Sequence, residues 1–204
     1  LNRAVLAELA MDPPSRRSGD PRLLAHVLVN RPRGDGGLGE LLDAALLALP
    51  SFAAIRRRTE VAARSVAAEL PADRRASLMM VNATCGALLA RLVPELARQG
   101  ADVRIVDGSR EALAFLDAGL TTRPPSVLLK LVQEDLGALV LGRSSSFFEA
   151  VDFVVVDALL DYLPDRLAAA LVAWVRDHLK PGGAVIFTGL GASEDAWLMD
   201  HVLG

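Results

Sequence analysis

Short apolar runs alternate with segments of helical apolar spacing through most of the chain after residue 75. Each run ends close to a small, polar or acidic residue. Strands that alternate with helices in this way are typical of an α/β fold with a parallel sheet. The predicted strands are residues 78–81, 103–106, 127–132, 151–156 and 184–188.

Helix signals fill the gaps between these strands. After the turn at residues 82–86 we expect a helix that Gly100 ends, and then a helix that Ser109 caps and Gly119 ends. The later predicted elements are a helix over residues 166–179, a Lys-Pro-Gly-Gly turn over 180–183 and a last helix over 192–203.

The first part of the chain has a different pattern, mostly helical. We therefore predict an N-terminal helical extension over residues 1–73 and a Rossmann-like core over residues 74–204. Within the extension, Pro50 is expected to end one helix and Ser51 to cap the next, whereas residues 23–29 fit a helix or a strand. The Gly-rich stretch 31–37 fits a surface loop better than the alternative, a lid over a cofactor domain.

Residues 78–107 form the most informative stretch, a strand–turn–helix–strand unit that ends in an acid. The first strand leads through a small-residue turn into a helix N-terminus, where free N–H groups and the helix dipole attract negative charge. Asp107 follows the second strand, about 20 residues beyond the turn, where a carboxylate can accept hydrogen bonds from both ribose hydroxyls. The alternative is a parallel strand that ends in Asp with no ligand. The pattern favours a nucleoside ligand.

These elements resemble the class I S-adenosylmethionine-dependent methyltransferases. The segment VRIVDGSREAL closely matches the second-strand segment of that family, whereas Asn82, Thr84 and Leu88 stand where the family has an acid and two glycines, and Gly86 is kept. The resemblance implies a Rossmann-like doubly wound sheet and S-adenosylmethionine as the cofactor. The cofactor-binding residues that it implies are Asn82, Thr84, Gly86, Asp107, Gly108, Glu134, Asp135 and Asp157.

The segment after the third strand, Gln133-Glu134-Asp135, is similar to the one whose acid binds the adenine amino group in this family. An ionised Asp135 accepts hydrogen bonds and so suits an exocyclic NH2. A helix N-cap is the plain alternative for Asp135, since Asp is common there. Its register with Asp107 favours the functional interpretation.

The exit of the fourth strand faces the transferred methyl group in this family, and it makes Asp157 and Tyr162 the catalytic candidates. A carboxylate or a phenol there can position or deprotonate a nucleophile. A packed ring with a satisfied hydroxyl is an equally good interpretation of Tyr162. The Asn/Asp-Pro-Pro-aromatic signature of enzymes that methylate planar nitrogens is absent, which argues against base or glutamine methylation.

A narrower resemblance is to bacterial methyltransferases related to those that make 3-hydroxy fatty-acid methyl esters. It rests on an Arg cluster ahead of the glycine-poor turn and on residues 160–166 after the fourth strand. It implies a carboxylate acceptor, which is already ionised at neutral pH and needs no strong base. Arg31, Arg33 or one of the arginines 56–58 could bind such an acceptor. A solvated face or ion pairs are the alternative for these arginines.

Two departures from the family pattern keep a second hypothesis open. A positive φ at Thr84 would be strained, and Asn82 lacks the charge that would help to hold a methionine ammonium group. The C-terminal antiparallel hairpin of the family is missing after Leu203, and the chain begins at Leu1 instead of Met, which suggests a fragment. The alternative to an active enzyme is therefore an inactive methyltransferase-like binding or dimerisation module of a larger protein. A nicotinamide-dependent dehydrogenase is disfavoured because the turn lacks Gly-x-Gly-x-x-Gly.

Composition narrows the remaining classes. A net charge of −3 over 204 residues gives no basic footprint for nucleic acid, and no apolar run is long enough for a membrane span. The single cysteine, Cys85, excludes an internal disulfide, and the three histidines show no metal-ligand spacing, so no metal is expected. We expect a cytoplasmic protein with a small-molecule substrate, either as a homodimer or joined to flanking domains.

Overall fold

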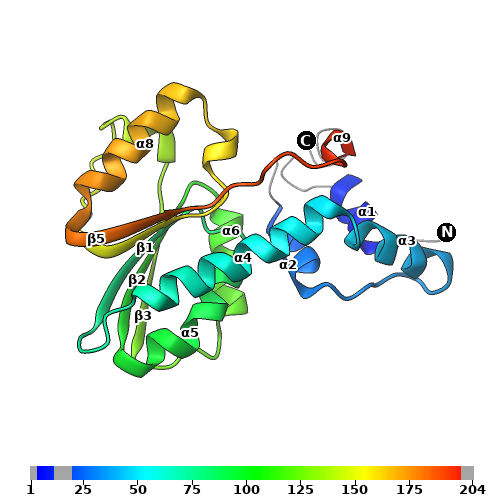
Figure 1. The fold of residues 1–204 in the computed structure, drawn as a ribbon, viewed down its shortest axis with the longest axis horizontal. Coiled ribbons are helices and arrows are strands. Elements are labelled where there is room, and N and C mark those ends of the chain that lie inside the picture. The colour runs from blue at the N-terminus through cyan, green and yellow to red at the C-terminus, as the bar shows by residue number, and fades with distance from the viewer. Residues whose placement is uncertain (1–3, 12–19, 199–204) are drawn as a thin grey trace. The chain divides into compact units, whose positions relative to one another are not determined.

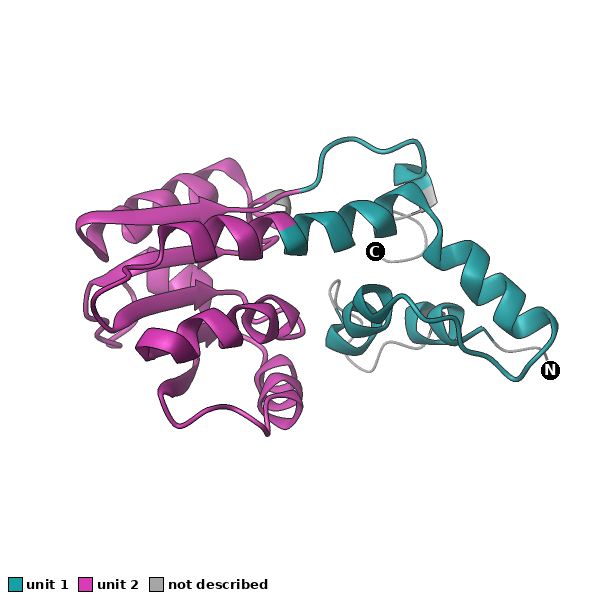
Figure 2. Cartoon of the chain, turned by 60° about the horizontal axis from the view of Figure 1, so that its bottom comes forward, with its two compact units in different colours: residues 1–60, 190–204 teal, residues 61–189 magenta. Residues whose placement is uncertain are grey.

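A computed structural model describes residues 4–11 and 20–198 of the chain (Figure 1). The chain forms two compact units, residues 1–60 with 190–204, and residues 61–189 (Figure 2). These units divide within helix α4 (Pro50–Glu69), whereas the sequence prediction places its boundary after residue 73. The assignment of residues 1–73 as an extension or lid stays a prediction.

The second unit contains a five-stranded sheet in the order β3-β2-β1-β4-β5. Every neighbouring pair of strands is parallel, which confirms the predicted Rossmann-like α/β fold. The strands are β1 (Ala76–Val81), β2 (Ala101–Asp107), β3 (Val127–Gln133), β4 (Val151–Val156) and β5 (Leu179–Phe187).

Helices cover both faces of this sheet (Figure 1). The end of α4 packs on one face with α5 (Ala87–Gln99) and α6 (Arg110–Gly119). The short α7 (Leu136–Val140) and α8 (Asp165–Asp177) pack on the other, and a 3₁₀ turn, η1 (Leu160–Tyr162), precedes α8.

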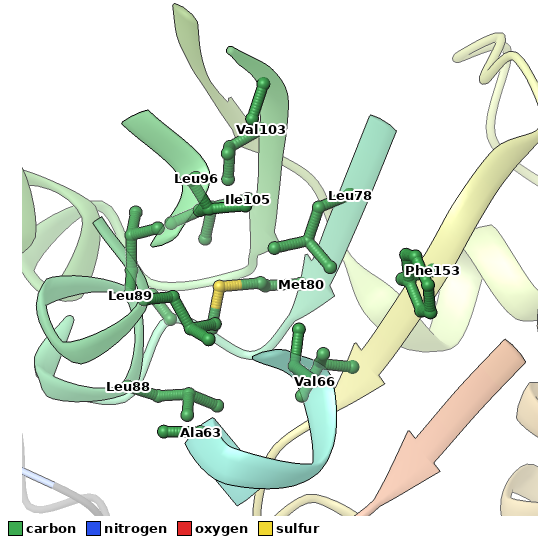
Figure 3. Packing of buried hydrophobic residues seen from close by; sticks show 14 of the residues in the cluster. Ala63, Val66, Leu78, Met80, Leu88, Leu89, Leu96, Val103, Ile105 and Phe153 are labelled. Atoms are coloured by element: carbon green, nitrogen blue, oxygen red, sulfur yellow. The ribbon is translucent and has the colours of Figure 1, made fainter. Parts of the chain in front are cut away.

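Strand β1 lies at the centre of both hydrophobic layers. Leu78 and Met80 point toward Leu89 of α5 and Val66 of α4 (Figure 3), whereas the alternate residue Met79 packs in the opposite layer. All three β1 side chains are almost fully buried. Burial on both faces explains why the central strands read as unbroken apolar runs instead of alternating ones.

Local signals explain several element boundaries. Gly100 follows α5 with φ +79, and Ser109 accepts a hydrogen bond from the Ala112 N–H at the start of α6, as predicted. Gly119 is instead the last residue of α6, and Leu120 caps it with a backbone N–H.

The first unit is helical and is organised around one buried carboxylate. Asp43 is fully buried in α3 (Leu38–Leu47) and accepts hydrogen bonds from the N–H groups of Leu6 and Arg33. His26 of α2 (Pro21–Val29) donates to it through Nε2 at 2.8 Å. Residues 23–29 are thus helical, and the same carboxylate also connects α1 (Val5–Met11) to the 31–37 loop.

Several predicted boundaries were wrong. The Lys-Pro-Gly-Gly segment belongs to β5, whose pairing with β4 shifts register between Val151 and Phe153 of β4, and α8 ends at Asp177 instead of continuing to residue 179. Ser51 does not cap a helix, because α4 already begins at Pro50, and its hydroxyl donates to Asp195 at 2.7 Å. The described part of the predicted last helix is only α9 (Ala196–Leu198), and its remaining C-terminal residues 199–203 lie outside the described residues.

Over the described ranges, no single helix has both the length and the apolar composition for crossing a membrane. Helices α3 and α4 meet those criteria only when they are taken together, and they are bent by 58° at the break between them.

Candidate functional site

The acids and the turn that the sequence singles out gather at the carboxyl edge of the sheet. Val81, the last residue of β1, lies in register with Val106 of β2 and with Val156 of β4. The residues that follow, Asn82, Asp107 and Asp157, therefore leave three adjacent strands at the same level. In open α/β sheets this edge is where ligands bind.

Asp107 connects the end of β2 to the turn after β1. Its Oδ2 accepts a hydrogen bond from the Ala83 N–H and its Oδ1 accepts one from the Ser109 N–H, both at 2.6 Å. The side chain is buried, with the residue 6% exposed. Burial raises the pKa of Asp107, and the two hydrogen bonds offset this effect only in part. The carboxylate thus braces the turn from the position predicted for a ribose-binding acid.

The turn itself has an unusual backbone. Asn82, Thr84 and Gly86 have φ values of +77, +46 and +73. Only Gly86 adopts such a φ without steric cost, so the strain predicted for Thr84 is present. The Asn82 N–H donates to the Val106 carbonyl at 2.9 Å, which holds the start of the turn against β2.

Two of the residues that depart from the family pattern, Asn82 and Thr84, contact Asp157. Asn82 Nδ2 donates to the Asp157 carbonyl at 2.8 Å, and Thr84 Oγ1 lies 3.3 Å from Asp157 Oδ2. Thr188, the residue after β5, donates its hydroxyl proton to Asp157 Oδ1 at 2.6 Å. Asp157 is 3% exposed, so its carboxylate is enclosed by these polar groups.

The candidates after β3 have other partners. The Glu134 carboxylate accepts hydrogen bonds from the hydroxyls of Ser144, at 2.9 Å, and Ser146. Asp135 is exposed and caps α7 by accepting from the Ala138 N–H at 2.9 Å, as the plain alternative predicted. A Cβ added at Gly108 would lie 3.4 Å from the Glu134 carbonyl, so Gly108 keeps this edge close-packed.

Tyr162 lies in η1, and its side chain points largely to solvent with 64% of the residue exposed. The packed-ring interpretation of Tyr162 was therefore wrong. Its role as a catalytic residue stays a prediction, as does that of the buried Asp157.

Sequence reasoning missed the hydroxyl groups that hold these acids. Thr188 stands beside Asp157 because β5 is adjacent to β4 in the parallel sheet, and a polar residue at a strand tip was the only signal for it. Ser144 and Ser146 lie 10 and 12 residues beyond Glu134, after helix α7, and no periodic pattern indicates their hydrogen bonds to it.

The surroundings of two other polar candidates, Cys85 and Arg56, indicate a structural role. Cys85 is buried in the turn, and Arg56 donates to the Leu47 carbonyl at 3.0 Å near the end of α3. Among residues 4–11 and 20–198, no group of three or more His, Cys, Asp or Glu side chains is arranged to hold a metal ion.

Known proteins resemble this chain in sequence and in fold. No family model matches the chain. The chain is 31% identical over 108 residues, 53% of its length, to the ubiquinone biosynthesis O-methyltransferase of Photorhabdus laumondii. These residues make up 42% of that enzyme, so the chain matches less than half of its curated relative.

Two solved structures share the fold. One is that of a possible exported protein from Bordetella parapertussis, with a TM-score of 0.64 and 18% identity over 88% of this chain and 58% of that one. The other is the CurJ carbon methyltransferase, with a TM-score of 0.59 and 19% identity over 81% of this chain and 43% of that one. The chain is thus similar in sequence, over about half of its length, to an O-methyltransferase, and it shares its fold with a carbon methyltransferase.

Proposed function

We propose that the chain is a methyltransferase that binds S-adenosylmethionine at the carboxyl edge of β1, β2 and β4 and methylates a small molecule. One observation carries this proposal. The acid at the tip of β2 is joined by a 2.6 Å hydrogen bond to the turn that leads into α5, so a nucleoside-binding acid and an anion-attracting helix start form one rigid unit.

The residues present fit such a cofactor. An ionised carboxylate has about four lone-pair sites, and the two N–H groups use two of those on Asp107, which leaves sites for ribose hydroxyls. Asp135 uses Oδ1 to cap α7, which leaves Oδ2 for an amino group. Gly108, Glu134 and the turn residues Asn82, Thr84 and Gly86 complete the proposed cofactor site. When bound, the cofactor would supply an electrophilic sulfonium methyl group.

The chain itself has mainly to orient the acceptor and exclude water. Transfer to a nucleophile is a direct displacement, for which alignment accounts for a large part of the rate. Tyr162 presents an exposed hydroxyl next to the exit of β4, where it can hold an acceptor oxygen. In this proposal the buried Asp157 fixes the turn and receives a proton from a hydroxyl acceptor. A carboxylate acceptor would need no such base, because it is ionised at neutral pH.

The contacts of Asn82 and Thr84 favour a second candidate function, that of a methyltransferase-like module that does not catalyse methyl transfer. The Thr84 side chain occupies the place of a family glycine, and both Asn82 and Thr84 bond to Asp157. Such side-chain contacts can fill the space in which the backbone of the turn would come close to a cofactor. A module of this kind would serve for binding or dimerisation in a longer chain.

Calorimetric titration with S-adenosylmethionine and S-adenosylhomocysteine tests the first candidate against the second. We expect the wild type to bind with micromolar affinity and Asp107→Ala to lose binding by at least about 100-fold, since two charge-assisted hydrogen bonds to ribose are worth about 3 kcal/mol or more. Asp102→Ala is the matched control, because Asp102 lies on the same strand but pairs with Arg75 at 2.9 Å. Equal affinity of the wild type and Asp107→Ala, or no binding at millimolar ligand, would contradict the proposal.

If the titration shows binding, the predicted acceptor can be tested next. The acceptor is proposed to carry a carboxylate or a hydroxyl group, by the resemblance to 3-hydroxy fatty-acid methyltransferases, and fatty acids are the first acceptors to screen. The binding of that carboxylate by one of the N-terminal arginines stays a prediction. A cytoplasmic location, a homodimer and the absence of a nucleic-acid partner likewise stay predictions.

A further inference from the structure

Thr188 makes two hydrogen bonds with one hydroxyl group. Its Oγ1 donates to Asp157 Oδ1 at 2.6 Å and accepts from the Ala158 N–H at 2.9 Å. A hydroxyl has one proton and two lone pairs, so it can make both bonds at once. The residue is buried, which shields these bonds from water. Valine has nearly the same shape as threonine but can make neither bond.

These hydrogen bonds involve residues whose backbone is strained. Ala158 has φ +53, a left-handed conformation that is strained for an L-residue, and its N–H donates to Thr188. Asn82 and Thr84, which also have positive φ, contact the carbonyl and the carboxylate of Asp157. Strained residues persist where the surroundings over-determine them, and here the surroundings are this set of polar contacts.

The contacts form a continuous path from β5 to the turn after β1. Thr188 orients the Asp157 carboxylate, and Asp157 accepts from Asn82 through its carbonyl and lies near Thr84 through Oδ2. Thr84 Oγ1 has a single proton and lies closer to the Ala83 carbonyl, at 2.8 Å, than to Asp157, at 3.3 Å. The orientation of Asp157 therefore depends more on Thr188 than on Thr84.

We propose that Thr188 is a positioning residue of the cofactor site, which acts by fixing Asp157 and, through the carbonyl and the carboxylate of Asp157, the 82–84 turn. The inference rests on the proposed function. It assigns to the tip of β5 a role in binding the cofactor, although Thr188 acts through another residue. Thr84 stands in the turn where the family has a glycine, and side chains hold the turn in place.

Calorimetric titration with S-adenosylhomocysteine, which cannot turn over, tests this role on three proteins. We expect Thr188→Val to bind about 10-fold more weakly than the wild type, the effect of losing one hydrogen bond to a charged group. Thr188→Ser keeps the hydroxyl and should retain wild-type affinity. Thermal unfolding of each variant confirms that it is folded, and Thr188→Ala replaces the valine variant if that protein does not fold.

A double-mutant cycle separates positioning from a structural role. Because Thr188 acts through the Asp157 carboxylate, Thr188→Val should add little to the loss of affinity caused by Asp157→Ala. Wild-type affinity in Thr188→Val, an equal loss in Thr188→Ser, or a full additional loss in the Asp157→Ala background would each overturn the inference. A wild type that binds no ligand would overturn the proposed function itself and the inference with it, whereas these three outcomes leave the proposed function standing.

Discussion

Replacing Asp152 with Asn should destabilise the sheet at the edge opposite to the site. Asp152 lies on β4 and is 4% exposed, and its Oδ2 accepts from the Ser77 N–H at 2.8 Å and from the Ser77 hydroxyl at 2.6 Å. Arg74 and Lys180 lie 2.8 and 3.3 Å from the same carboxylate. One carboxylate thus joins β1, β4 and β5, and its substitution tests how much of the stability of the fold depends on it.

The magnitude follows from these contacts. Hydrogen bonds to a charged group contribute about 1.5–3 kcal/mol each and neutral ones about 0.5–1.5, so removing the charge from the two Ser77 bonds costs about 2–3 kcal/mol. The ion pairs add less, because the side chains of Arg74 and Lys180 are 54% and 43% exposed and solvent screens them. Asp152→Asn should therefore lower the free energy of unfolding by about 2–3 kcal/mol at pH 7.

The effect should also depend on pH in a defined direction. Burial alone would raise the pKa of Asp152, but the hydrogen bonds from Arg74 and Ser77 and the charge of Lys180 outweigh it and hold this pKa well below the ordinary 3.8. A depressed pKa gives stability that is fully present above the unfolded-state pKa and is lost as pH falls toward the folded-state value. The difference between the wild type and Asp152→Asn should shrink below pH ~4.

Urea unfolding followed by tryptophan fluorescence measures both quantities. The chain has two tryptophans, so a Trp197→Phe background leaves Trp174 of α8 as the reporter for the sheet unit. Asp102→Asn is the matched control, since it breaks an ion pair whose acid is 55% exposed and should cost at most about 1 kcal/mol. Equal small losses in both variants, or a difference that grows at low pH, would refute this reasoning.

Two further substitutions test the turn and the helical unit. Gly86→Ala should cost about 2–3 kcal/mol, since its φ of +73 is strained for alanine and the new Cβ would lie 2.9 Å from Leu116 Cγ, whereas Gly142→Ala, with φ +67 and open space, should cost only about 1 kcal/mol in urea unfolding. Asp43→Ala should cost about 3–5 kcal/mol in the helical unit, because the Leu6 and Arg33 N–H groups and His26 lose their buried acceptor, and loss of hydrogen-exchange protection at the Leu6 amide would measure it. Equal costs at the two glycines, or unchanged protection in Asp43→Ala, would contradict these assignments.

The central strands and the parallel direction of the sheet could be predicted because β1 and β4 are buried on both faces. Burial of β1 between two layers of helices requires an unbroken apolar run, and such runs are visible in the sequence. The start of β5 could not be predicted in the same way. Its Pro181 and Gly183 read as a turn, yet β5 is an edge strand, where proline is tolerated, and a Cβ at Gly183 would come 2.9 Å from the Asp152 carbonyl.

The positions of the candidate site residues followed from topology, whereas their hydrogen bonds did not. Parallel strands bring Asp107 and Asp157 to one edge whatever their neighbours are. Which groups each acid bonds depends on residues far apart in sequence, such as Thr188 and Asp157, 31 residues apart. Hydrophobic periodicity carries no information about such pairs.

The same contacts explain why the turn departs from its family in two places at once. An acid at residue 82 could not donate to the Asp157 carbonyl and would place a negative charge beside it, whereas the Asn82 amide donates at 2.8 Å. Glycine at residue 84 would relieve the strained φ but would leave the Asp157 carboxylate without a hydroxyl at 3.3 Å. The substitutions at residues 82 and 84 are thus coupled through Asp157. Together with Thr188, they make a turn that is held by side-chain contacts.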